Sequence, residues 1–359
     1  MDSKDQLQEA VASAEAYPFV GRTLGELGFV ISVEPKSRGR AEVALRLPTP
    51  HLPGLNDRLQ EALSPFVREA EVSVEVMDEA EAARWIAELR EKAGPGIGEP
   101  GSPTRTIGIA SGKGGVGKSS VSTNLAVALR RAGKTVGIVD ADIWGFSIPA
   151  MFGIDHPPIV IGETIVPPVA HGVKVMSMDY FVGDDKAVIW RGPMLHKAIE
   201  QFLKDVFWDG PDFLIVDMPP GTGDVAISMS QILPRAQVLL VTTPQSAAQR
   251  VARRAALMAD QVDQEVIGVV ENMSWFTGDD GKRYELFGAG GGRSLAEELG
   301  VDLMAQVPLM PAMGRGADEG RPVAVAAPGS EAAEAFDALA QAVIEKKPRV
   351  RTHPSLVIR

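Results

Sequence analysis

Residues 112–119 read GKGGVGKS, and this stretch decides the fold of the chain. It fits the pattern G-x-x-x-x-G-K-[ST], a loop whose backbone N–H groups surround phosphates, whose lysine meets the β and γ oxygens and whose hydroxyl binds Mg²⁺. We therefore expect Lys118 to be catalytic and Ser119 to be a metal ligand. The residues expected to contact the nucleotide here are Gly112, Lys113, Gly114, Gly115, Val116, Gly117, Lys118, Ser119 and Ser120.

The surroundings of this loop favour the same interpretation. Residues 107–110 are apolar and predict a strand before the loop, and a stripe of apolar residues at helical spacing follows it and ends at Gly133. The positive end of that helix dipole favours a bound triphosphate. A strand, a glycine-rich loop and a helix in this order predict a phosphate site.

Four further apolar stretches, at residues 136–139, 213–216, 238–242 and 266–270, alternate with helical stretches. Strands that are apolar throughout are buried on both faces, as in parallel sheets covered by helices. We predict a doubly wound, mostly parallel α/β P-loop NTPase domain.

Length and composition predict a second, smaller domain before it. A chain of 359 residues is long for one core, and residues 94–103 read GPGIGEPGSP, which is typical of a linker. Before the linker, two expected strands, a helix over residues 55–69 and the alternating Val72, Val74 and Val76 indicate a small α+β domain. The predicted division is 1–93 for this domain, 94–104 for the linker, 105–345 for the ATPase domain and 346–359 for a basic, partly disordered tail.

Composition also excludes several classes of protein. Apolar residues make up 45% and charged residues 23%, which is the balance of a globular chain. The net charge of −11 opposes general binding to nucleic acid or anionic membranes. No apolar run is long enough to span a bilayer and the first residues lack a signal core, so we expect a cytoplasmic protein. Cysteine is absent, which excludes disulfides and thiolate metal ligands in this chain.

Lys113 directly follows the first glycine of the loop, and with it the loop resembles the deviant Walker-A ATPases. This class contains the nitrogenase iron protein, the arsenite-pump ATPase and the cell-division and chromosome-partition ATPases. The resemblance implies that Lys113 reaches across a homodimer interface to the partner's nucleotide, where its charge acts as an arginine finger does. Lys113 is therefore a candidate catalytic residue.

Polar residues at the ends of three expected strands complete the predicted site. Carboxylates at such an edge can hold Mg²⁺ or orient the attacking water, and the resemblance to the class implies that Asp142 positions that water while Asp140 lies nearer the metal. Asp217 resembles the Walker-B acid that holds Mg²⁺ through water. Gly221 would let a backbone N–H approach the γ-phosphate, and the Asn272 amide suits the edge of adenine.

The motifs SGKGGVGKSS, VDADIWGFSIP, IWRGPM, VDMPPGTGD and VENMSWF together resemble the Mrp family, also called ApbC or Nbp-type iron–sulfur cluster carrier ATPases. The likeness covers residues 106–323. It implies an ATP- and Mg²⁺-dependent dimer that serves iron–sulfur assembly factors or apoprotein clients. The front domain resembles the small domain of iron–sulfur assembly factors, although an acidic turn is absent near Tyr17-Pro18 and His51 lies where some relatives carry cysteine.

One departure bears on the cargo. Many members of that family carry a C-x-x-C pair after the ENMS motif, but residues 276–286 here read FTGDDGKRYEL. Asp279 and Asp280 are hard oxygen ligands that replace thiolates poorly at iron–sulfur centres. A smaller departure is Phe146, where relatives usually have proline. We expect no iron–sulfur ligand in this chain, so that any cluster would be held by a partner.

Two other functions stay open. A nucleotide-gated scaffold with no metal role is compatible with the missing cysteines. A positioning switch on membrane or DNA is a further alternative, and the acidic balance counts against it. In either case we expect binding and hydrolysis of MgATP.

Overall fold

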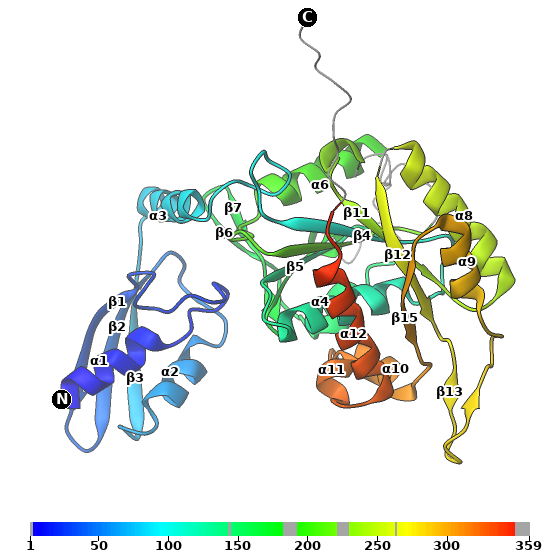
Figure 1. The fold of residues 1–359 in the computed structure, drawn as a ribbon. Coiled ribbons are helices and arrows are strands. Elements are labelled where there is room, and N and C mark those ends of the chain that lie inside the picture. Colours follow the sequence, from blue (N-terminus) through cyan, green and yellow to red (C-terminus); the bar gives the residue numbers. More distant parts are fainter. Residues whose placement is uncertain (1–2, 143–144, 182–191, 221–229, 263, 349–359) are drawn as a thin grey trace, which may run out of the picture. The chain divides into compact units, whose positions relative to one another are not determined.

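The computed structural model describes residues 3–142, 145–181, 192–220, 230–262 and 264–348 (Figure 1). The chain forms two compact units. Unit 1 comprises Met1–Pro95, His156–Gly172 and Asp205–Asp209, and unit 2 comprises Gly96–Asp155, Val173–Lys204 and Gly210–Arg359. Two short segments from within the expected ATPase domain therefore belong to the same compact unit as the N-terminal residues. Ile97 of the expected linker is buried.

Unit 1 is a small α+β unit, as predicted. Its elements are α1 (Ser3–Ser13), β1 (Val30–Lys36), β2 (Arg40–Leu47), α2 (Leu55–Leu63), β3 (Glu69–Val76), α3 (Glu79–Lys92), β6 (Ile159–Ile161), β7 (Thr164–Val166) and β8 (Val169–Ala170). The sheet has the order β1-β2-β3, with β1 antiparallel and β3 parallel to β2. The prediction that the helix over residues 55–69 continues to Glu69 was wrong. Ser64 keeps helical dihedral angles, but Pro65 has no N–H with which to continue the helical hydrogen bonds, so the helix ends at Leu63.

The inserted segment at residues 205–209 is held in unit 1 by specific contacts. The Arg22 guanidinium donates two hydrogen bonds to the Asp209 carboxylate, at 2.8 and 2.6 Å. The ring of Phe207 packs on Phe19 in the apolar core. Such paired charge and aromatic packing explain why residues 205–209 belong to this unit.

Unit 2 contains the predicted parallel sheet. Its strands are β4 (Arg105–Ser111), β5 (Val136–Asp140), β9 (Val173–Ser177), β10 (Phe213–Asp217), β11 (Gln237–Thr242), β12 (Glu265–Asn272) and β15 (Asp302–Val307), with a hairpin of β13 (Phe276–Thr277) and β14 (Arg283–Tyr284). Its helices are α4 (Lys118–Arg131), α5 (Ile148–Phe152), η1 (Met178–Phe181), α6 (Gly192–Lys204), α8 (Ser246–Gln261), α9 (Gly291–Leu299), α10 (Pro311–Asp318), α11 (Val323–Ala326) and α12 (Glu331–Glu345). The strands lie in the order β15-β12-β11-β4-β10-β5-β9 and pair in parallel. The predicted doubly wound fold is confirmed.

The order of the strands also explains which helices cover which face. The chain moves from β4 to β5 in one direction through α4, and from β11 to β12 to β15 in the other direction through α8 and α9. Right-handed crossovers in opposite directions place their helices on opposite faces of the sheet. Accordingly α8 packs on α9, whereas α4 packs on α12 (Figure 1).

The carboxyl ends of the central strands carry buried polar side chains. They are Ser111, Asp140, Asp217, Thr242 and Asn272. Polar groups at this edge of an open parallel sheet mark the crevice in which such folds bind ligands. The sheet therefore places the residues singled out by sequence at one edge.

Candidate functional site

The loop between β4 and α4 requires glycine at two positions. Gly115 and Gly117 have φ values of +78° and +80°, a region that favours glycine. A side chain on Gly117 would also collide with the amide nitrogen of Asn272. The local sequence therefore specifies the loop conformation, and the loop ends at the positive end of α4.

A cavity of about 220 Å³ lies against this loop. Its lining combines the loop with residues from the ends of β5 and β10. They are Ser111, Lys113, Gly114, Gly115, Gly117, Lys118, Ser119, Ser120, Asp142, Ser147, Met151 and Pro220. The structure thus brings Asp142 and both lysines of the loop to one cavity.

Within it, Lys118 lies between two carboxylates. Its Nζ donates to Asp217 Oδ2 at 2.6 Å and lies 3.8 Å from Asp142 Oδ2. Ser119 Oγ donates to the same Asp217 oxygen at 2.6 Å, and Ser122 Oγ donates to the other at 2.6 Å. Mg²⁺ prefers oxygen ligands such as hydroxyl and carboxylate groups, so these side chains fit the expected ion.

Ser122 was missed by sequence reasoning. It follows Lys118 by one helical turn on α4, so its side chain lies on the same face of the helix. That spacing is the signal that could have identified it. Its hydroxyl holds the Asp217 carboxylate in place from the helix side.

Asp140 lies behind the cavity and is not among its lining residues. Its Oδ1 accepts the N–H of Asp142, and its Oδ2 accepts the N–H groups of Ser147 and Ile148, each at 3.2 Å. Burial, and then the negative charge of Asp217, raise the pKa of Asp140 to about 7. Its contacts organise the chain that follows β5, and its expected role near the metal stays a prediction.

Lys113 lines the cavity from its outer side. Its Nζ lies 3.4 Å from Gln245 Oε1, at the long end of hydrogen-bond distances. A lysine so weakly held keeps its side chain available for another partner. Its action across a dimer interface stays a prediction.

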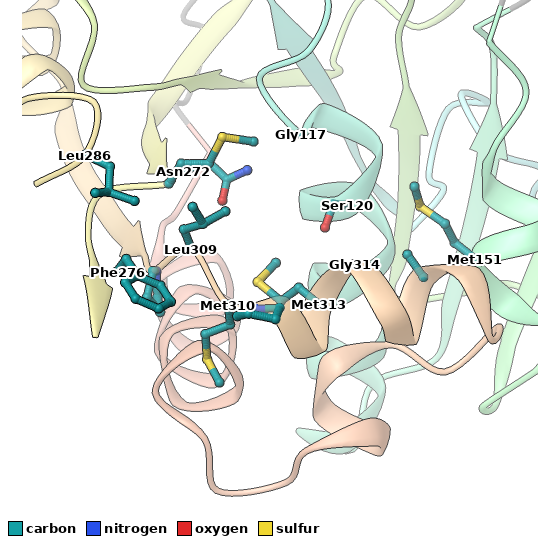
Figure 2. A pocket seen from close by; sticks show the side chains of 14 residues that line it. Gly117, Ser120, Met151, Asn272, Phe276, Leu286, Leu309, Met310, Met313 and Gly314 are labelled. Carbon is teal, nitrogen blue, oxygen red and sulfur yellow. The ribbon is translucent and has the colours of Figure 1, made fainter. Parts of the chain in front are cut away.

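A second cavity of about 570 Å³ adjoins the loop, and Figure 2 shows residues that line it. The described lining is almost wholly apolar, and among these described residues only Ser120 and Asn272 carry polar side chains. The lining residues are Gly117, Ser120, Met151, Asn272, Met273, Phe276, Leu286, Pro308, Leu309, Met310, Pro311, Met313, Gly314 and Ala317. An apolar cavity with few polar groups suits a nucleobase.

The amide of Asn272 has a defined orientation in this cavity. Its nitrogen donates to the carbonyl oxygen of Val116 at 2.9 Å. Because a carbonyl only accepts, the amide oxygen must be the atom on the other side. Figure 2 shows that oxygen directed away from Gly117. The contact with adenine expected for Asn272 stays a prediction.

Parts of the predicted site lie outside the described residues. These parts are Gly221 with the rest of residues 221–224, Ile143 and Trp144 in the motif after β5, and residues 189–191 of the IWRGPM motif. No statement on their geometry follows from the structure.

Residues 102–344 match the family model described as ParA: NUBPL iron-transfer P-loop NTPase. The chain belongs to this family. A curated iron–sulfur cluster carrier protein from Mycobacterium leprae is 42% identical to it over 341 residues, which cover 90% of this chain and 89% of the relative. A protein of the same description from Bacillus subtilis is 41% identical over 315 residues, or 86% of this chain and 89% of that protein. These relatives confirm the likeness to the iron–sulfur carrier family.

Solved structures agree on the fold of the iron-transfer P-loop NTPase domain. A nucleotide-binding protein from Archaeoglobus fulgidus, solved with ADP, is 34% identical, with a TM-score of 0.57, and the match covers 69% of this chain and 96% of that chain. The septum site-determining protein MinD of Pyrococcus horikoshii, solved with Mg-ADP, has a TM-score of 0.53 at 24% identity over 67% of this chain and 96% of its own. The second likeness shows the fold alone.

Ligands of the kind that hold iron–sulfur clusters are few in this sequence and among the described residues. The chain has no cysteine. In the part of the chain that the structure describes, no group of three or more histidine or carboxylate side chains could hold a metal ion. No helix among the described residues is long and apolar enough to cross a membrane.

Proposed function

We propose that the chain is a homodimeric MgATPase that acts in the assembly or transfer of iron–sulfur clusters without thiolate ligands of its own. The observation that carries the proposal is that Lys118, Ser119 and Asp142 line one cavity beside an apolar cavity, with the buried Asp217 bonded to Lys118 and Ser119. Membership of the iron-transfer P-loop NTPases and the ADP-bound Archaeoglobus structure support the nucleotide.

Four residues at the phosphate cavity have a task in this proposal. Ser119 and Asp217 would hold Mg²⁺, Asp217 through water, and the ion supplies positive charge at the phosphate groups. Lys118 contributes its charge to the terminal phosphate oxygens. Asp142, held near Lys118, orients the attacking water.

Lys113 completes the site of the partner protomer. Positive charge placed at the transferring phosphoryl group stabilises the transition state, and true arginine fingers contribute roughly 10³- to 10⁵-fold in rate. The weak contact with Gln245 leaves Lys113 available for this task. Hydrolysis then depends on the dimer.

The clusters are the cargo, and their thiolate ligands come from clients or assembly factors. Iron–sulfur centres are held by thiolates and occasionally histidine, and this chain has no cysteine. The carrier relatives at 42% and 41% identity support the cargo, while the ligand chemistry of this chain supports a role in handover.

An anaerobic transfer assay tests the proposal. A cluster-loaded donor and an apoprotein client are mixed with the chain and MgATP, and the client's enzymatic activity is followed. We expect ATP-dependent acceleration by the wild-type chain and none by Lys118→Ala, with no stable chromophore on the chain alone. ATP hydrolysis without any effect on transfer would favour the nucleotide-gated scaffold, and a stoichiometric cluster on the purified chain would contradict the ligand argument.

A further inference from the structure

The carboxylate of Glu271 is fully enclosed at the end of β12, next to Asn272 in sequence. Glu271 is 1% exposed, and its hydrogen-bond partners among the described residues are all neutral. Oε1 accepts from Gln306 Nε2 at 2.8 Å and lies 2.9 Å from Ser274 Oγ, and Oε2 accepts the N–H of Gly292. A buried carboxylate is costly unless it is hydrogen-bonded, and here both oxygens have partners that hold the side chain in one position.

The Gly292 contact joins Glu271 to the start of α9. Gly291–Leu299 is a full helix whose positive end favours a carboxylate. A side-chain carbon on Gly292 would lie 2.6 Å from the Glu271 Cβ, so glycine is required there. The glycine run that begins α9 therefore makes room for this carboxylate.

Successive residues of a strand point to opposite faces of the sheet. Glu271 is directed to the α9 side, whereas Asn272 is directed to the nucleotide loop, where its amide reaches Val116. Fixing Glu271 therefore fixes the backbone from which Asn272 projects.

The bond from Glu271 to Gly292 also closes the loop of residues 273–291. Ser274 and Gln306 tie the same carboxylate to the start of that loop and to β15. Phe276 and Leu286 of the loop line the apolar cavity together with Asn272 (Figure 2). One carboxylate thus holds several walls of the cavity that adjoins the phosphate loop.

We propose that Glu271 is the positioning residue of the nucleobase pocket, acting through Asn272 and the loop of residues 273–291. The inference rests on the proposed nucleotide-binding function and assigns the affinity for the base, as distinct from the phosphates, to this carboxylate. None of the partners of Glu271 lines the phosphate cavity.

Equilibrium binding of two ligands separates the affinity for the base from the affinity for the phosphates. MgADP uses both cavities, whereas magnesium tripolyphosphate has no base and uses the phosphate cavity alone. For Glu271→Met, which removes both acceptor oxygens, we expect ADP affinity to fall about tenfold and tripolyphosphate affinity to change by less than about twofold. Glu271→Gln keeps an acceptor for Gly292, and Gln306 can turn its amide to match, so this variant should stay within about threefold of wild type for ADP.

Glu298→Met on α9 is the matched control, because Glu298 is exposed and pairs with Arg253 on the surface. It should bind both ligands as wild type does. If Glu271→Met does not fold, Gln306→Leu removes one donor to the carboxylate and should lower ADP affinity about threefold with tripolyphosphate unchanged.

Two results would overturn the inference: equal loss of both ligands in the Glu271 and Gln306 variants, or wild-type ADP affinity in them. A wild-type chain that binds neither ligand would overturn the proposed function itself, and one that binds both ligands equally would show that the apolar cavity is not a base pocket.

Discussion

Around Lys118 the site is crowded with charge, whereas the adjoining cavity has apolar walls and one oriented amide. The smaller cavity, of about 220 Å³, is organised by hydrogen bonds of 2.6 Å among Lys118, Ser119, Ser122 and Asp217. The larger one, of about 570 Å³, is shaped by packing. Charged networks in a buried setting tolerate little change, while apolar walls adapt. Substitutions at the charged cavity should therefore have larger effects on function than substitutions at the apolar cavity.

The largest effect is expected for Lys118→Ala. The substitution removes the charge that faces the terminal phosphates and leaves Asp217 buried without its cation, so turnover should fall more than about 10²-fold. Steady-state release of phosphate measures it, with Lys134→Ala beyond the far end of α4 as the control. Unchanged hydrolysis would show that the phosphates bind elsewhere.

A smaller loss, confined to the chemical step, is expected for Lys113→Ala. Because the lysine acts on the partner's nucleotide, kcat should fall at least about tenfold while the affinity for ADP stays near wild type. Mixing this variant with Lys118→Ala provides a sharper measurement. Each mixed dimer has one complete site, so an equimolar mixture should recover about a quarter of wild-type activity by random pairing.

The absence of any recovery on mixing would place Lys113 in its own protomer's site. An equimolar mixture of Lys118→Ala with Lys134→Ala should keep about half of wild-type activity whether or not protomers exchange, so it tests whether Lys118→Ala inhibits an active partner.

The contrast between the two cavities also explains what could be predicted from sequence. The phosphate cavity could be predicted because β4, the loop and Lys118 are contiguous in sequence. Asp217 ends an apolar strand, and Asp142 follows shortly after another. The confirmed fold and family follow from these local patterns. Ser122 was missed although a single helical turn separates it from Lys118.

The base side could not be predicted in the same way, because its walls come together only on folding. Pro308 to Ala317 reach the cavity from beyond β15, and Glu271 meets Gly292 across a loop of residues 273–291. No periodicity in the sequence indicates contacts between residues so far apart in the chain. Its place at a strand end and the resemblance to the class likewise suggested a metal role for Asp140, whereas its described contacts are with the backbone of the following segment and with Ser177 Oγ.

Asp140 makes the stability of the protein depend on pH in the absence of nucleotide and Mg²⁺. Its pKa is raised to about 7, mainly by burial. Between the ordinary carboxyl pKa and pH 7, the folded protein therefore keeps a proton that the unfolded chain releases. This contribution to stability is present at low pH and is lost as the pH rises toward about 7. The melting temperature of wild type should therefore fall by several degrees between about pH 5 and 7.5 relative to Asp140→Asn. Parallel slopes for the two proteins would contradict this assignment.

The smallest effect is expected for base selectivity at Asn272. Because its amide nitrogen is engaged by Val116, the pocket presents an acceptor, which suits the 6-amino group of adenine and opposes the 6-oxo group of guanine. One hydrogen bond in an apolar pocket discriminates modestly, so we expect ADP to bind about tenfold more tightly than GDP. Asn272→Ala should remove the preference chiefly by weakening ADP, since an apolar wall cannot distinguish two purines of similar shape. Competition between the two nucleotides measures the preference, and a pocket that preferred GDP, or kept its preference without the amide, would have its selectivity in the packed walls instead of in Asn272.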